Sequence, residues 1–160
     1  MTAADYRNDT PMEGATAPSR PLIKVVISRK HWLRGEEDSA LRRSRDEKMC
    51  CVGFMCVAAG IDERKITDLG GVQSIDPSIR GKLPVDEPGP YFPLYAINDT
   101  YAGVTLRDRQ EEEEEEEACF DKEVITALED IYDVPMTEEL REAEIIKHAR
   151  PLGFDVEFVD

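Results

Sequence analysis

The segment KMCCVGFMCVAAG, residues 48–60, constrains the fold more than any other part of the chain. No charged residue occurs in the 13 positions from Met49 to Ile61, and such a run is buried because each Å² of apolar surface left in water costs about 25 cal/mol. A membrane-spanning helix needs about 20 residues, so this run is too short to be one. The segment therefore predicts a buried helix over 49–59 that ends at Gly60, since glycine accepts the left-handed conformation there.

Three of the four cysteines lie in this segment, at positions 50, 51 and 56. Structural zinc sites usually combine pairs of cysteines two to four residues apart with further cysteines or histidines, and the chain has only two histidines. We therefore interpret the thiols as small core side chains and expect no metal and no other cofactor. Gly53, inside the predicted helix, indicates that another backbone segment packs closely against it.

Two short segments near the ends of the chain predict strands. Residues 22–28 (LIKVVIS) are a β-branched run too short for a helix, and residues 154–159 (FDVEFV) alternate apolar and charged side chains with the period of a half-exposed strand. We expect the two strands to be neighbours in one small sheet.

Two further helices are predicted in the last third of the chain. Apolar residues from Phe120 to Ile131 recur at helical spacing, which predicts an amphipathic helix over about 113–133 within the segment 107–134. Thr137 is placed to cap another helix over 138–150. The expected core face of that second helix consists of Leu140, Ala143, Ile146 and Ala149. By contrast, residues 71–98 are rich in proline and glycine and predict turns with no long regular element.

These segments together predict a single α+β domain over residues 22–160, in which a small sheet containing the first and last strands is packed by three or more helices. Residues 1–21 are polar and interrupted by prolines, which predicts a disordered tail. They lack the apolar core of a secretory signal, so we expect a cytoplasmic protein with free thiols.

The net charge of −15 is concentrated in the last third of the chain. Basic and acidic residues number 10 and 8 in 1–48, 6 and 8 in 49–110, and 4 and 19 in 111–160. Such a region repels nucleic acid and anionic membranes and favours a partner protein with a basic surface. The alternative is a charged segment that only maintains solubility. The candidate interaction residues are Glu111, Glu112, Glu113, Glu114, Glu115, Glu116 and Glu117.

Other chemistry-bearing residues define an alternative site. They are His31, Trp32, Arg34, Cys50, Asn98 and Asp99. A nucleophile at Cys50 would need a base such as His31 beside it, and Asp99 would supply an acid, although Asn-Asp-Thr is equally ordinary in turns. The chain has no glycine-rich phosphate-binding motif. These residues therefore favour no particular reaction, and no catalytic residue is assigned.

Four segments in this order resemble a group of small uncharacterised proteins of tailed bacteriophages and prophages. They are HWLRG (31–35), KMCCVGF (48–54), IND (97–99) and REAEIIKHARPLGFDVEFV (141–159), which match W-L-R-G, C-C-x-G-F, N-D and R-E…G-x-x-V-x-F. The resemblance covers most of residues 22–160 and makes the region at about 107–135 an acidic insertion. It implies the cytoplasm of an infected bacterial host and brings no established activity.

We therefore expect one of three functions. The first is a phage accessory protein that binds and inhibits a host protein, such as a defence or nucleic-acid-handling factor, through its acidic surface and without contacting nucleic acid or membrane directly. The second is a small enzyme or nucleotide-binding module that uses the alternative site. The third is a structural or regulatory component that forms homo-oligomers.

Overall fold

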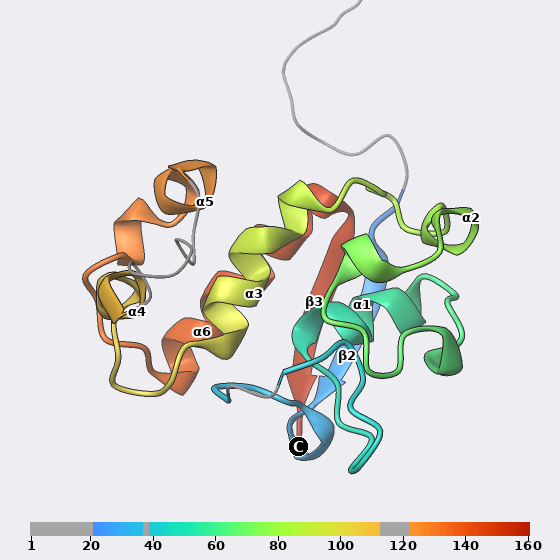
Figure 1. The fold of residues 1–160 in the computed structure, drawn as a ribbon, viewed down its shortest axis with the longest axis horizontal. Helices are drawn as coiled ribbons and strands as arrows, with labels where there is room; N and C mark the ends of the chain where they lie inside the picture. Colours follow the sequence, from blue (N-terminus) through green and yellow to red (C-terminus); the bar gives the residue numbers. More distant parts are fainter. Residues whose placement is uncertain (1–20, 37–38, 113–121) are drawn as a thin grey trace, which may run out of the picture.

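Residues 21–36, 39–112 and 122–160 are described by a computed structural model of the chain. Figure 1 shows the order of the elements along the chain. The strands are β2 (Ile23–Ser28) and β3 (Phe154–Val159), and the helices are α1 (Cys51–Ala58), α2 (Pro77–Arg80), α3 (Phe92–Asp99), α4 (Leu106–Glu112), α5 (Lys122–Ala127) and α6 (Glu138–Ala149). Short 3-10 helices between them are η2 (Arg29–His31), η3 (Glu63–Lys65), η4 (Val72–Ser74), η5 (Gly89–Tyr91), η6 (Glu129–Ile131) and η7 (Arg150–Leu152). The predicted tail falls almost wholly outside the described residues.

The first and last strands pair with each other, as predicted. β2 and β3 run parallel, in a register that begins with Ile23 opposite Phe154 and ends with Ser28 opposite Val159. Parallel strands need a long crossover connection, and the described helices all belong to the connection between these two strands. The chain is thus a small α+β domain with the predicted sheet.

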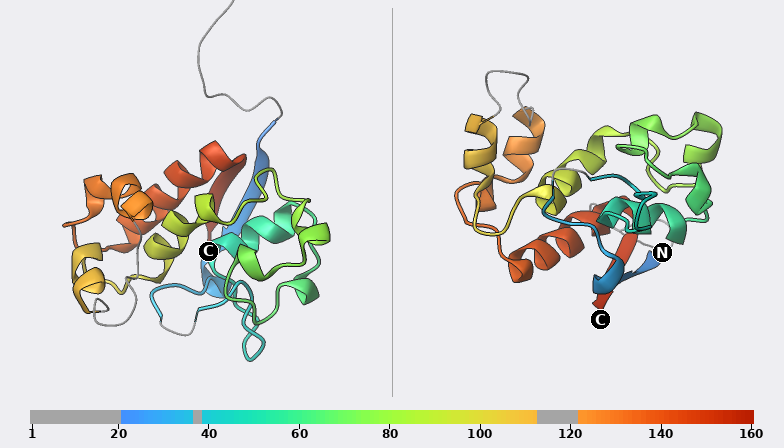
Figure 2. Two further views of the ribbon diagram at one scale, coloured as in Figure 1. Left: turned by 45° about the horizontal axis from the view of Figure 1, so that its top comes forward. Right: turned by 60° about the horizontal axis from the view of Figure 1, so that its bottom comes forward.

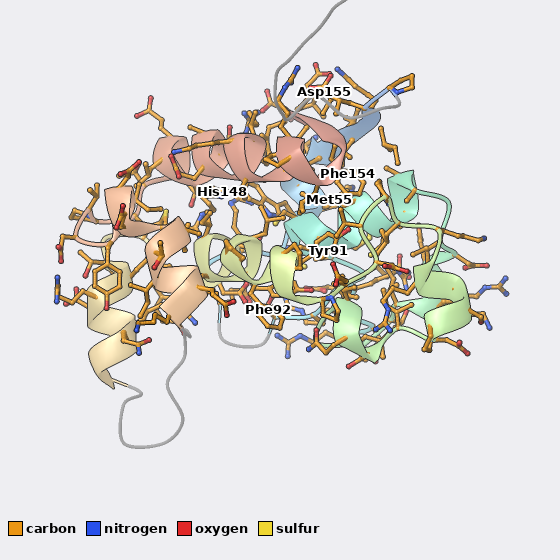
Figure 3. The ribbon with its side chains drawn as sticks, turned by 90° about the horizontal axis from the view of Figure 1, so that it is seen from above. Met55, Tyr91, Phe92, His148, Phe154 and Asp155 are labelled. Atoms are coloured by element: carbon orange, nitrogen blue, oxygen red, sulfur yellow. The ribbon has the colours of Figure 1, made fainter. Side chains whose placement is uncertain are left out.

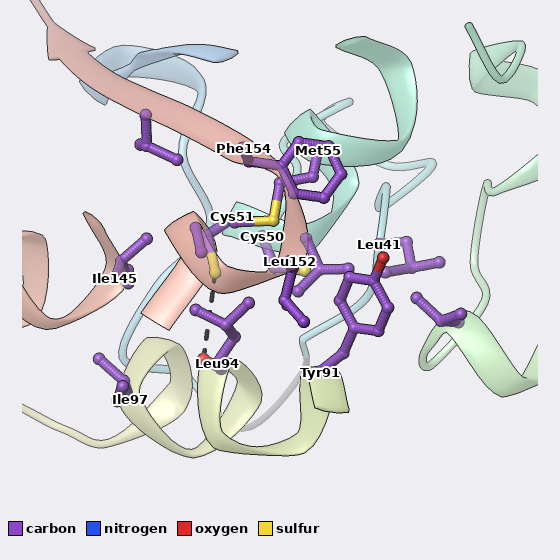
Figure 4. Packing of buried hydrophobic residues seen from close by; sticks show 14 of the residues in the cluster. Leu41, Cys50, Cys51, Met55, Tyr91, Leu94, Ile97, Ile145, Leu152 and Phe154 are labelled. Atoms are coloured by element: carbon purple, nitrogen blue, oxygen red, sulfur yellow. Dashed lines mark hydrogen bonds between the residues drawn. The ribbon is translucent and has the colours of Figure 1, made fainter. Parts of the chain in front are cut away.

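Helix α1 confirms the interpretation of the uncharged segment. It packs against both α3 and β2, and Gly60 follows it with a φ of +101°. A Cβ atom at Gly53 would overlap the carbonyl oxygen of Leu41, so the predicted close approach of a second backbone is present. Figure 4 shows Cys51 beside α3, where its thiol lies 4.0 Å from the Leu94 carbonyl oxygen. The thiols serve as core side chains.

Helix α3 was not predicted. The segment before residue 98 looked too rich in proline for a regular element, yet Pro93 lies in the first turn of α3, where a missing N–H costs nothing. Burial then holds the helix in place, since Leu94 and Ile97 are both fully buried. The expectation of turns alone was wrong because it treated every proline as a helix terminator.

The amphipathic segment at 107–134 does not form one helix. In its described part α5 ends at Ala127, and the backbone N–H of Arg107 donates to the Tyr132 carbonyl oxygen at 3.1 Å. A continuous helix would hold those two residues roughly 38 Å apart. Figures 1 and 2 show α4 and α5 side by side at one end of the molecule. The prediction of a helix that continues to residue 133 was therefore wrong at its C-terminal end, and its first half falls outside the described residues.

Helix α6 begins at the predicted residue and ends one residue earlier than predicted, and its core face agrees only in part with the prediction. The Thr137 hydroxyl accepts from the Leu140 N–H at 3.1 Å and caps the helix as expected. Of the expected core residues Ala149 is buried and Leu140 is half-buried, but Ala143 and Ile146 are exposed. The other buried residues of the helix are Arg141 and Ile145. The expected face was rotated because an arginine had been excluded from the core.

Candidate functional site

The candidate site is centred on Asn98, in the last turn of α3. Its Oδ1 accepts from Trp32 Nε1 at 2.8 Å and from the Cys51 N–H at 3.1 Å. Its Nδ2 donates to the Leu33 carbonyl oxygen at 2.9 Å and to Asp99 Oδ1 at 2.8 Å. The side-chain amide has two donor hydrogens and two acceptor lone pairs, so intramolecular bonds use all of its capacity. We call these five residues the Asn98 network.

Arg141 closes the network from α6. It is 1% exposed, and its Nη1 donates to the carbonyl oxygens of Ile97 and Asn98 at 2.9 and 2.8 Å. Those carbonyls belong to the C-terminal end of α3, where backbone acceptors lack helical partners and a cation is favoured by the helix dipole. Burial lowers the pKa of Arg141, and Nη2 lies 3.6 Å from a carboxylate oxygen of Glu138. Arg141 therefore ties α6 to α3.

Trp32 connects the same region to the end of β3. Its ring lies 4.7 Å from that of Phe158, and the guanidinium of Arg34 stands over its face at 4.4 Å. Arg34 also pairs with Glu138 at 2.8 Å, which joins the loop after β2 to α6. The segments around Trp32, Cys51, Asn98 and Arg141 are therefore in mutual contact, although they are far apart in the sequence.

The structure brings together four of the six residues of the alternative site: Trp32, Arg34, Asn98 and Asp99. Cys50 lies close by but is 3% exposed, and burial raises the pKa of its thiol to about 12, so it is protonated near neutral pH. His31 is exposed on η2. The buried thiol and the exposed imidazole are thus in different environments, and they do not make the nucleophile and base pair that a thiolate mechanism needs.

The pKa of Asp99 is raised, and a raised carboxyl pKa is a feature of many catalytic acids. Burial raises its pKa, while hydrogen bonds from Asn98 and Ser39 and the charges of Arg109 and Arg141 act in the opposite direction. A partly buried carboxyl of this kind can exchange a proton, which is the requirement for general acid or base work. The Asn98 and Trp32 side chains beside it are buried and hydrogen-bonded to each other. The arrangement holds segments of the fold together rather than presenting free groups.

Two of the surface clefts in the described part of the chain lie outside the Asn98 network. The first, of about 280 Å³, is lined by Ser39, Ala40, Arg43, Ser44, Arg45, Asp68 and Gly70. Its buried cation, Arg43, contacts carboxylate oxygens of Asp46 and Glu36 at 2.7 and 3.0 Å, and this pairing lowers the pKa of Asp46 to about 2. Because both carboxylates contact it, Arg43 is not available to an anionic ligand. The second cleft is apolar and lies between α3 and α5.

The structure describes the start of the glutamate run and the acidic residues that follow it from residue 122 onward. Glu111 and Glu112 end α4, and residues 113–117 fall outside the described part of the chain. Several exposed carboxylates beyond the run are ion-paired: Asp133 with Arg107, and Asp130 with Lys147 at 3.8 Å. Glu138 is also exposed and pairs with Arg34, and further exposed acids between residues 122 and 139 are Glu123, Glu129 and Glu139.

Sequence reasoning missed Arg141. A signal was available, because Thr137 sets the start of α6 and Arg141, Ile145 and Ala149 then fall at i, i+4 and i+8 on one face. Within residues 21–36, 39–112 and 122–160, no three or more His, Cys, Asp or Glu side chains are grouped to hold a metal ion. In the same part of the chain, every helix is too short or too polar to cross a membrane.

Comparison with known proteins gave no match to a protein-family model, to a curated protein or to a solved structure.

Proposed function

We propose that the protein binds a partner protein through the acidic surface of its last third. The observation that carries the proposal is the charge distribution, with 4 basic and 19 acidic residues in 111–160. A surface of one sign attracts a basic partner over a distance set by the Debye length, about 8–10 Å at physiological salt.

The residues of the alternative site form contacts that stabilise the fold, and this supports a binding protein over an enzyme. Asn98 has no remaining hydrogen-bonding capacity, Trp32 is 2% exposed, and the Cys50 thiol is buried. A substrate would have to break these contacts to reach the groups. The acidic residues, by contrast, include many that are exposed in the described part of 111–160.

We extend the proposal to the class of partner. From the resemblance to phage proteins, the partner is a protein of the bacterial host, and binding inhibits it. A basic patch is typical of proteins that handle nucleic acid, and an acidic surface competes for such a patch as a polyanion would. This makes a nucleic-acid-handling or defence protein the expected target.

A pull-down from bacterial lysate tests the proposal. The full chain is compared with a variant in which Glu111 to Glu117 are all glutamine, a change that keeps side-chain size and helix propensity almost constant. We expect one or more basic proteins to be retained by the wild type and lost from the variant. Equal retention by both would contradict the proposal, and retention of copies of the chain itself would favour the oligomerising alternative.

A further inference from the structure

The apolar cleft lies at the surface, where the start of α3 faces α5. Its volume is about 350 Å³. Figure 3 shows Phe92 at the edge of the molecule near α5. The lining residues are Gly89, Pro90, Phe92, Pro93, Glu123 and Val124. Gly89, Pro90 and Glu123 are exposed, Phe92 is half-buried and Val124 is buried, so the cleft has an exposed rim and an apolar base.

The α3 side of the cleft is rigid. Pro90 lies in η5 and Pro93 in the first turn of α3, and each fixes its own φ angle. Tyr91, between them, is fully buried and donates its hydroxyl hydrogen to the Val85 carbonyl oxygen at 2.6 Å. The ring of Phe92 packs at 6.1 Å from that of Tyr95. A wall held in this way needs little ordering when a ligand binds.

The charge around the cleft is negative. Glu123 is the one ionisable residue among the lining residues that the structure describes. Asp86 and Glu87 are exposed and lie just before η5 in the sequence, so the α3 side also carries carboxylates close to the rim. Lys122 is the nearest basic residue in the sequence, beside Glu123. Among these lining residues and their described near neighbours in the sequence, three carboxylates stand against one lysine, which favours a ligand with positive charge next to its apolar part.

We propose that the cleft takes one apolar side chain from a segment of the partner protein in which that side chain is flanked by lysine or arginine. The inference rests on the proposed function. It names the feature of the partner that is recognised, an apolar side chain next to basic residues. A volume near the lower end of ligand pockets, about 300–1,000 Å³, suits a single anchor side chain. Interfaces commonly draw most of their affinity from one such buried anchor surrounded by charged contacts that set specificity.

Three synthetic peptides titrated into the uniformly ¹⁵N-labelled full chain test this inference by NMR. Their central sequences are Lys-Lys-Leu-Lys-Lys, Lys-Lys-Gly-Lys-Lys and Glu-Glu-Leu-Glu-Glu. We expect the first to shift the amide signals of Gly89, Phe92, Glu123 and Val124. Replacing the leucine by glycine should weaken binding roughly 10- to 100-fold, because the buried apolar side chain is lost, and the glutamate peptide should not bind.

Two variants locate the site. Phe92→Ala removes an apolar wall, and Glu123→Lys reverses the charge at the rim without changing a buried residue. Both variants should bind the Lys-Lys-Leu-Lys-Lys peptide several-fold more weakly than the wild type. The matched variant Glu129→Lys, at an exposed acid on η6 that does not line the cleft, should have a smaller effect. If Phe92→Ala disturbs folding, its amide spectrum will report this, and Glu123→Lys then decides the question.

Several outcomes would overturn the inference. They are equal binding of the leucine and glycine peptides, binding of the glutamate peptide, no shift with any peptide, or shifts of the same amides with protein concentration alone, which would make a second copy of the chain the occupant. The proposed function is judged separately. If no peptide binds but the Glu111 to Glu117 variant still loses the partner, only the cleft is wrong; if the peptides bind and that variant keeps the partner, the acidic surface is wrong.

Discussion

Replacing Asn98 by alanine should cost a large part of the stability of the domain. The side chain bonds the Trp32 indole N–H, the Cys51 N–H and the Leu33 carbonyl oxygen, all in buried residues. A buried polar group left without a partner costs about 1–3 kcal/mol, so three such groups give about 3–9 kcal/mol. Water that enters the vacated space would satisfy some of them, which places the expected loss at about 4 kcal/mol. Domains of this size have only about 5–15 kcal/mol in total.

Urea unfolding of the full chain measures this loss directly. Trp32 is the only tryptophan, so its fluorescence reports on the network itself, and circular dichroism follows the helices independently. A loss of about 4 kcal/mol would lower the Tm by about 8–16 °C. Gln73→Ala, which removes an exposed side-chain amide, is the matched control and should stay within about 0.5 kcal/mol of wild type. A loss below about 1 kcal/mol for Asn98→Ala would refute the view that this amide joins the segments.

Three further predictions concern the core and the network. Gly53→Ala should destabilise the domain by at least about 2 kcal/mol in the same urea assay, because its Cβ would overlap a backbone carbonyl, whereas Gly70→Ala, which meets nothing within 4 Å, should be tolerated. The three cysteines of segment 50–56 should resist iodoacetamide at pH 8 until urea unfolds the chain, as followed by mass spectrometry of peptides; rapid native labelling would contradict their burial. Burial raises the pKa of Asp99, so the native state binds more protons than the unfolded chain between the two pKa values, and this group lowers stability as pH rises through that window; Asp99→Asn should remove that decline, and an unchanged pH profile would count against it.

Local patterns predicted the elements whose residues carry their own signal. The two strands were found because they are short, apolar and β-branched or alternating, and α1 because an uncharged run of that length has to be inside. Thr137 marked the start of α6 through its hydroxyl, which accepts a hydrogen bond as a cap does. In each case the information lies within a few residues, so no knowledge of the rest of the chain was needed.

The elements that were missed depend on contacts between distant segments. Helix α3 exists because Leu94 and Ile97 pack into the core, and that burial outweighs the proline-rich sequence around them. The end of α5 depends on the chain returning so that Tyr132 meets Arg107, a contact that periodicity does not contain. Periodicity describes the face of a helix, but it does not say where the helix stops.

The candidate site was half predictable for the same reason. Trp32, Arg34, Asn98 and Asp99 were singled out as chemically capable residues, and they do meet. Their role as structural contacts was not evident, because it follows from the hydrogen bonds of Asn98 to two distant segments, at Trp32 and Leu33 and at Cys51, and to the adjacent Asp99. Arg141 was missed because a charged residue was assumed to face water, whereas its buried Nη1 donates to the carbonyl oxygens of Ile97 and Asn98 at the end of α3.

The central claim, that the acidic surface itself recognises a basic partner, is tested most directly by association kinetics. Once the pull-down has identified the partner, its association rate is measured against ionic strength for the wild type and for two variants with the same net charge of −11, each made by removing four negative charges from −15. The first changes Glu114 to Glu117 to glutamine. The second neutralises four acids outside residues 111–160, Asp5, Asp9, Glu47 and Glu63.

We predict that the first variant associates roughly tenfold more slowly at low salt and depends less on salt, while the second stays close to wild type. Equal rates for all three proteins, or an equal fall in both variants, would contradict the claim, because binding would then depend on another surface or on net charge alone.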